Sequence, residues 1–391
     1  MVWPFARHSH PQSPVGTVTE RGPFLPDRFA FKFFRELVRA NDTSNVFCSP
    51  FSVMLCLMMI WDGATGETRE AIAKTLEIVE DPDGCQRFLK AALDISGPGL
   101  ELAIANSLWC DEQARILPAF MTVAREKYAA EVVSLPFPSP DAVSRINAWV
   151  AEKTRGKIGS IIDTLDSSGL LVALNAIYFK GLWEGPFERS LTREERFFTP
   201  GNHSVKVSLM QRFGYYPYHE ESSFQAVRLP YRGDRVGMYI FLPSKESGLP
   251  GFVPILTSTE WGRWMRAFTE TQGLVGLPRF KFEQCVNLIP VLANLGMSEV
   301  FDPHTARFDG ISPPPPPLYI GQAIHRALVE VNEEGTEATA TTAFGLFGGV
   351  ERAPRAFQMI MDRPFFFAIR DDHSNMILFM GAVNDPTLVS S

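Results

Sequence analysis

The chain has 391 residues, of which 45% are hydrophobic and 21% are charged. This balance is typical of a globular protein with a buried core and excludes global disorder. Lys and Arg together number 37 and Asp and Glu 44, so the formal net charge is −7. Such a chain has no net positive field to attract a nucleic-acid backbone or an anionic membrane surface. We therefore expect neither nucleic acid nor a membrane as a partner.

The first 26 residues contain five prolines and no apolar stretch of signal-peptide length, and we expect a flexible tail there. No repeat or Gly/Ser linker divides residues 27–391, which favours a single domain. The five cysteines are widely spaced and never form a C-x-x-C pair, so they predict neither a disulfide framework nor a zinc site. These features favour a cytoplasmic setting, and an extracellular one reached by another route stays open.

Apolar residues recur at the spacing of an amphipathic helix within the first 165 residues, which are expected to be mostly helical. The segments expected to be helices are 29–38, 50–61, 68–76, 120–129 and 144–154. Strand-like runs bounded by turn residues dominate the rest of the chain. The segments expected to be strands are 170–179, 204–210, 226–231, 236–242 and 327–332. Helices first and strands later, without βαβ alternation, predict an α+β fold with mainly antiparallel or mixed sheets.

A long segment from Gly335 to Pro354 lies between two strand-like runs and lacks any helix signal. A loop of that length in a compact domain usually has a function or is disordered. In an extended conformation, small side chains would line one face of its first half, namely Thr336, Ala338, Ala340 and Thr342. The segment is therefore suited to be a loop in one state and a buried strand in another.

The sequence has no recognisable catalytic or nucleotide-binding motif, neither G-x-S-x-G, H-E-x-x-H, G-x-x-x-x-G-K nor G-x-G-x-x-G. Its histidines do not have the spacing of metal ligands, and we expect no metal, no cofactor and no enzymatic activity. His325 precedes an apolar strand-like run. If the strand is buried, both ring nitrogens of His325 need hydrogen-bond partners.

Short motifs distributed from about Asp27 to Pro386 resemble those of the serpin family. They are, in chain order, Asn45–Ser52, Gly63–Thr68, Ala105–Trp109, Asn175–Trp183, Asn332–Ala338, Asp362–Phe365 and Phe379–Gly381. The resemblance implies a serpin fold with three β-sheets, about eight or nine helices and an exposed, strained reactive-centre loop at about 335–356. It also implies a protein that acts as a monomer and is not an enzyme.

The family resemblance implies a suicide-substrate inhibitor of serine proteases. The protease attacks a peptide bond of the loop and forms an acyl-enzyme. The freed loop segment then enters the main sheet as a new strand and traps that acyl-enzyme, as is known for serpin loops. The hinge at which insertion starts would comprise Glu333, Glu334, Gly335, Thr336, Glu337, Ala338, Thr339 and Ala340.

Two further groups of family residues can be placed on this sequence. Four residues match the shutter, a polar cluster beneath the centre of the main sheet, namely Ser49, Ser52, Asn175 and His325. Three match the breach, where the loop first enters the sheet, namely Trp183, Arg279 and Glu333. The resemblance implies an ion pair between Glu333 and Arg279, whose strength depends on how far it is buried.

Two counts give different positions for the cleaved bond. Counting forward from Glu333 at the family's usual spacing places it between Gly349 and Val350. Counting back from Pro364 places it near Ala353, because this loop is longer than usual. The forward count is preferred, since the inserted length determines where the protease is carried.

The residue before the cleaved bond selects the protease. Gly349 predicts a protease that accepts small residues, of elastase or subtilisin type. The alternatives are Phe347 for a chymotrypsin-like and Arg352 for a trypsin-like protease. A cysteine protease target and a non-inhibitory role as a chaperone, carrier or storage protein also stay open. The small, proline-free hinge favours inhibition over these roles.

Overall fold

The computed structural model describes residues 26–41, 43–78, 82–165, 170–201, 203–336 and 356–388. The helices within them are α1 Pro26–Ala40, α2 Pro50–Gly63, α3 Gly66–Leu76, α4 Pro82–Leu93, α5 Pro118–Tyr128, α6 Ala142–Lys153, α7 Gly248–Phe252, α8 Ser258–Met265 and α9 Leu288–Leu292. The strands are β1 Val46–Cys48, β2 Leu100–Asp111, β3 Glu131–Leu135, β4 Leu171–Leu182, β5 Arg193–Phe198, β6 Ser204–Glu221, β7 Phe224–Pro230, β8 Val236–Pro243, β9 Thr269–Pro278, β10 Phe280–Asn287, β11 Ile320–Asn332, β12 Gly335–Thr336, β13 Phe357–Ile360, β14 Phe365–Asp371 and β15 Met376–Val383.

The described strands form two hydrogen-bonded sheets. The six-stranded sheet, called the main sheet below, has the order β10-β11-β12-β4-β2-β3, and the nine-stranded sheet has the order β1-β15-β14-β8-β7-β6-β9-β13 with β5 paired to β6. Three sheets were expected. The difference arises because the 18-residue β6 pairs with β5 and β9 along most of its length and with β7 at its end. One strand thereby joins two groups of strands that would otherwise be separate.

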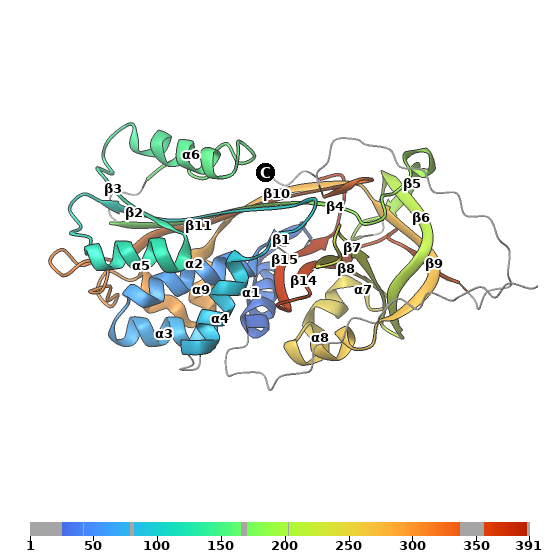
Figure 1. The fold of residues 1–391 in the computed structure, drawn as a ribbon, viewed down its shortest axis with the longest axis horizontal. Coiled ribbons are helices and arrows are strands. Elements are labelled where there is room, and N and C mark those ends of the chain that lie inside the picture. The colour runs from blue at the N-terminus through green and yellow to red at the C-terminus, as the bar shows by residue number, and fades with distance from the viewer. Residues whose placement is uncertain are drawn as a thin grey trace, which may run out of the picture.

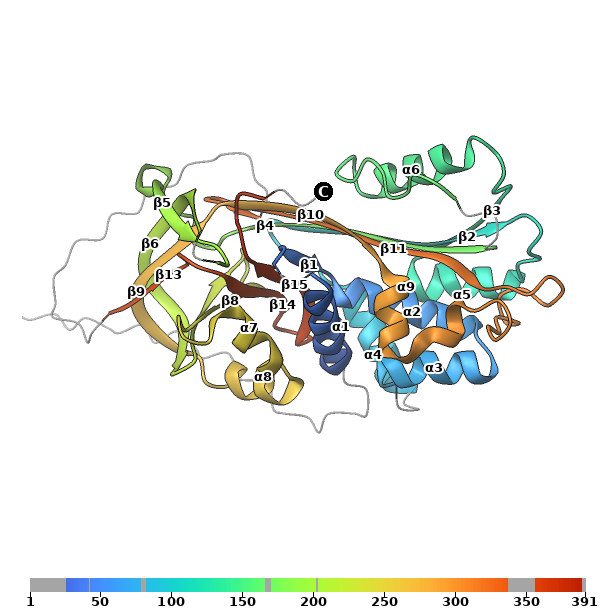
Figure 2. The same cartoon turned by 180° about the vertical axis from the view of Figure 1, so that it is seen from behind.

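Helices cover both faces of the main sheet. Figures 1 and 2 show α6 on one face, and α2, α3, α5 and α9 gathered below the other. On the α6 side, Ile146 and Val150 pack with Trp109, Val172 and Leu174 of the sheet in a small apolar cluster. Strands β5, β6, β9 and β13 lie at the opposite end of the molecule from α3 and α5 (Figure 2).

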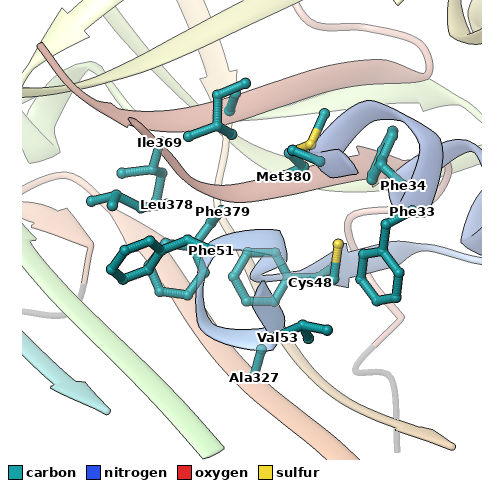
Figure 3. Packing of buried hydrophobic residues seen from close by; sticks show 14 of the residues in the cluster. Phe33, Phe34, Cys48, Phe51, Val53, Ala327, Ile369, Leu378, Phe379 and Met380 are labelled. Atoms are coloured by element: carbon teal, nitrogen blue, oxygen red, sulfur yellow. The ribbon is translucent and has the colours of Figure 1, made fainter. Parts of the chain in front are cut away.

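Helix α2 is the helix predicted over residues 50–61. The Ser49 side chain caps its first turn by accepting a hydrogen bond from the Ser52 backbone, and Pro50 occupies the first helical position. Nearly every side chain of α2 is buried, as expected of a helix that is apolar on all sides. Figure 3 shows Phe51 and Val53 of this helix packed near Phe379 of β15 in the large core.

All five predicted helices and all five predicted strands coincide with described elements. The prediction that the first 165 residues are mostly helical missed β2, a strand of twelve residues. Its second half is buried on both faces, so it lacks the apolar–polar alternation by which strands are recognised.

Candidate functional site

The residues matched to the shutter come from three elements and meet at the centre of the main sheet. Asn175 of β4 and His325 of β11 are register partners in a parallel strand pair. Ser49 and Ser52 lie at the first turn of α2, which packs against β4. All four residues are fully buried. The sequence therefore places four polar side chains where each one needs a protein partner.

Hydrogen bonds satisfy this cluster and fix the protonation of its histidine. His325 Nε2 accepts a hydrogen bond from the Ser49 backbone N–H at 3.0 Å, so the proton of the neutral ring is on Nδ1, which donates to Asn175 Oδ1. Asn175 Nδ2 in turn donates to Ser52 Oγ and to Asn106 Oδ1. Burial lowers the pKa of His325 to about 3. The ring is therefore neutral at physiological pH.

The breach contains the expected ion pair, and one of its partners is buried. Arg279 Nε donates to Glu333 Oε1 at 2.8 Å, and Thr192 Oγ1 donates to the same oxygen at 2.6 Å. The Glu333 side chain is 3% exposed, whereas that of Arg279 is 46% exposed. Burial raises the pKa of Glu333, but the hydrogen bonds from Arg279 and Thr192 outweigh it, and the net pKa is below its ordinary value. The carboxylate is held ionised.

Trp183 binds the turn that follows β11. Its Nε1 donates to the Asn332 carbonyl at 3.0 Å, and its backbone N–H donates to the Glu334 carbonyl at 2.8 Å. Arg189 forms an ion pair with the Glu334 side chain at 2.6 Å. The segment from which the loop departs is thus fixed by both side-chain and backbone bonds.

A cavity of about 440 Å³ opens beside this turn. Its charged lining residues are Arg189, Arg279, Lys281, Glu330 and Glu333. Each basic side chain is ion-paired with a glutamate. The cavity therefore presents no basic side chain without an acidic partner.

The segment predicted to be the hinge begins inside the main sheet. Gly335 and Thr336 form β12, which pairs antiparallel with the ends of both β4 and β11. Gly335 has φ of +153°, and a Cβ atom there would lie 2.0 Å from the Gly181 carbonyl oxygen, so only glycine fits. Thr336 is fully buried. The remaining hinge residues Glu337, Ala338, Thr339 and Ala340, and the loop residues Phe347, Gly349, Val350, Arg352 and Ala353, lie outside the described residues.

Three partners of these sites were not anticipated from the sequence. Asn106 joins the shutter, Thr192 binds Glu333, and the Tyr231 hydroxyl lies 2.7 Å from that of Thr336. Of these three, only Asn106 could have been predicted from the sequence, because a polar residue within a buried apolar strand needs a polar partner.

In the part of the chain that the structure describes, no helix has the length and apolarity needed to cross a membrane. Within the same residues, no three His, Cys, Asp or Glu side chains gather as a possible metal site. The cysteines described there as free thiols are Cys48, Cys56, Cys110 and Cys285.

Comparison with known proteins gives consistent matches over nearly the whole chain. A family model described as Serpin (serine protease inhibitor) matches residues 25–386. The leukocyte elastase inhibitor of Sus scrofa is 35% identical over 373 residues, which cover 92% of this chain and 98% of that protein. Serpin B8 of Homo sapiens is 34% identical over 368 residues, which cover 92% and 97%.

Solved structures agree in fold. The thermophilic serpin tengpin in its native state superposes with a TM-score of 0.87 at 26% identity, covering 94% of this chain and 95% of that chain. Uncleaved ovalbumin gives a TM-score of 0.85 at 29% identity, covering 93% and 99%. The chain therefore belongs to the serpin family, whose members are described as serine protease inhibitors and not as enzymes.

Proposed function

We propose that this protein inhibits serine proteases as a suicide substrate. The observation that carries the proposal is the position of β12, which lies between β4 and β11 with Thr336 buried. A strand that continues from Thr336 would run antiparallel to both neighbours. Once a protease has cleaved and acylated the loop, the freed segment can extend β12 and carry the bound protease along.

Hydrogen bonding in the sheet supplies the driving force in this proposal. Residues 320–328 of β11 and 171–178 of β4 are now direct parallel neighbours. Insertion replaces that one pairing by two antiparallel ones. About a dozen new ladder bonds at roughly 1 kcal/mol net each amount to on the order of 10 kcal/mol before ordering costs. This is comparable with the stability of a domain, so the uncleaved form is expected to be kinetically trapped.

The two polar sites have distinct roles in the proposal. The shutter holds the sheet closed, because separating β4 from β11 breaks the hydrogen bond between Asn175 and His325. The breach is the first point of entry, where Trp183 and the Arg279–Glu333 pair fix the start of the loop. Opening therefore starts at an end of the sheet that is already parted.

The proposed target is a protease of elastase or subtilisin type that cleaves between Gly349 and Val350. Its support is the absence of a side chain at Gly349 and the likeness to proteins named leukocyte elastase inhibitor, of which that of Homo sapiens is 33% identical. A trypsin-like target cleaving after Arg352 and a chymotrypsin-like one reading Phe347 are the alternatives. We also propose a cytoplasmic site of action, which suits free thiols.

The decisive experiment incubates the full chain with elastase, subtilisin, chymotrypsin and trypsin. An SDS-stable complex is expected with elastase or subtilisin, together with a released C-terminal peptide that begins at Val350. A peptide beginning at Ala353 would instead identify Arg352 as the specificity residue. Cleavage without a complex for all four proteases would contradict the inhibitory function and favour a non-inhibitory role.

Two loop variants sharpen the assignment. Gly349→Arg is expected to transfer complex formation to trypsin, whose acidic pocket an arginine fills. Arg352→Ala is the matched control, since it removes the competing arginine and should leave the elastase complex unchanged. Loss of that complex in Arg352→Ala would refute the Gly349 assignment.

A further inference from the structure

The Tyr231 hydroxyl group contacts the first buried side chain of the loop. Its Oη lies 2.7 Å from Oγ1 of Thr336, and both residues are fully buried. Tyr231 directly follows β7 of the nine-stranded sheet, whereas Thr336 pairs with β4 and β11 in the main sheet. The hydrogen bond therefore ties the start of the loop to a residue outside the sheet that it enters.

Aromatic packing fixes the position of that hydroxyl. The Tyr231 ring stacks on Trp183 with centroids 4.6 Å apart and an interplanar angle of 12°, and it meets Phe179 edge to face at 5.1 Å. A Cβ atom on Gly181 would lie 2.5 Å from the ring, so the glycine makes room for it. Burial raises the pKa of Tyr231. The group therefore stays protonated and able to bond Thr336.

Thr336 is also the residue from which insertion would proceed. It pairs with Gly181 on one side and with Val331 on the other. The first direct contact between β4 and β11 beyond it is the pair of Tyr178 and Leu328. A chain that advances from Thr336 must separate that pair first.

We propose that Tyr231 is a positioning residue that holds Thr336 in the main sheet before cleavage. The kinetic consequence rests on the proposed inhibitory function: insertion starts from a strand that is already in place and outruns hydrolysis of the acyl-enzyme. The hold itself is a property of the uncleaved protein. Without the Tyr231 hydroxyl, the Thr336 hydroxyl would be buried with no partner, which favours departure of β12 from the sheet.

Hydrogen exchange on the uncleaved full chain tests directly whether Tyr231 keeps Thr336 in the main sheet. Tyr231→Phe and Thr336→Val each remove one hydroxyl while keeping the shape of the side chain. In either variant the amides of residues 333–336 are expected to exchange about fivefold faster, or more. The double variant should return toward wild type, because no hydroxyl is then left unpaired. Tyr128→Phe is the control, since it removes a buried hydroxyl that lies within hydrogen-bond distance of the Asp62 carboxylate and the Met58 carbonyl in another part of the chain.

A second measurement separates this proposal from the inhibitory function. With a protease that the wild type traps, Tyr231→Phe should raise the number of inhibitor molecules consumed per protease about threefold or more, at an unchanged rate of loop cleavage. Unchanged exchange at the hinge in both single variants would overturn the proposal. If exchange at the hinge is faster in the single variants but the wild type traps no protease, the role of Tyr231 in holding Thr336 is supported and only the proposed inhibitory function is refuted.

Discussion

Asn175 of β4 and His325 of β11 are hydrogen-bonded at the centre of the main sheet, whereas β12 separates the same two strands at their end. The imidazole of His325 donates from Nδ1 to Asn175 Oδ1 across the direct β4–β11 contact. Beyond Tyr178 and Leu328 the direct pairing stops, and β12 lies between the strands. In the proposed function, a new strand would therefore extend β12 from the residues matched to the breach toward those matched to the shutter.

Lowering the pH below about 6.5 should destabilise the folded protein through His325. The unfolded imidazole has a pKa of 6.5, whereas burial lowers the folded pKa to about 3. Between these values the unfolded chain binds a proton that the folded protein does not, so acid favours unfolding. The shutter contains no carboxylate that would offset this effect. A loss of about 2 kcal/mol is expected at pH 5 relative to pH 8.

The test compares urea-unfolding midpoints between pH 5 and pH 8. His325→Gln lacks the titrating ring and should show a flatter pH dependence than wild type. His304→Gln removes an exposed histidine and should behave as wild type does. Equal slopes for wild type and His325→Gln would show that another group controls the acid sensitivity.

Arg279→Ala should destabilise the protein by about 1–3 kcal/mol at pH 7, because it leaves the buried Glu333 carboxylate with fewer partners. The folded pKa of Glu333 is depressed, so its contribution is present above the unfolded pKa of about 4.5 and is lost as the pH falls through the lower folded pKa. The difference between variant and wild type should therefore shrink below about pH 4.5. Thermal melts of wild type and Arg279→Ala at pH 7 and pH 4 measure this difference in stability.

Lys206→Ala provides the control for this experiment. Its ion pair with Glu194 is exposed on both sides, at 75% and 65%, and such pairs contribute about 0–1 kcal/mol. A loss in Arg279→Ala no larger than that in Lys206→Ala would mean that the breach ion pair does not stabilise the native form.

Local sequence patterns predict five of the nine described α-helices and five of the fifteen described strands, because amphipathic spacing reports which faces are buried. Helix α1 and the beginning of strand β6 have that spacing. Strand β2 does not, because its second half is buried on both sides. Local patterns also do not predict that β6 joins two groups of strands into one sheet, because strand pairing depends on partners far away in the sequence.

Some contacts in the candidate sites could be predicted from the sequence and others could not. Motif resemblance predicts that Ser49 and His325 share a cluster, and the two are bonded. It does not predict the contact between Tyr231 and Thr336, which are 105 positions apart. Nothing local in either segment encodes that contact, because it arises only when the two sheets meet.

Thr336→Arg should convert the protein from an inhibitor into a substrate. Thr336 is fully buried with its hydroxyl bonded to Tyr231, and an arginine there would place an unpaired charge in the core. The hinge would stay outside the sheet, and cleavage would end in hydrolysis. Gel electrophoresis should show cleaved protein with little covalent complex. Thr122→Arg is the control, because it adds the same charge at an exposed helical position, and it should leave complex formation intact. An undiminished covalent complex in Thr336→Arg would refute the role of the hinge.

Cleavage of the loop should raise the melting temperature of the wild type by more than about 10 °C. The new strand adds on the order of 10 kcal/mol of hydrogen bonding, and each kilocalorie shifts the melting of a large domain by a few degrees. The same cleavage in Thr336→Arg should produce a much smaller rise, because burying the arginine opposes insertion. Melting curves before and after limited proteolysis of both proteins provide the comparison. An equal rise in both would mean that the stabilisation does not come from insertion past Thr336, and no rise in either would mean that the main sheet does not accept the loop.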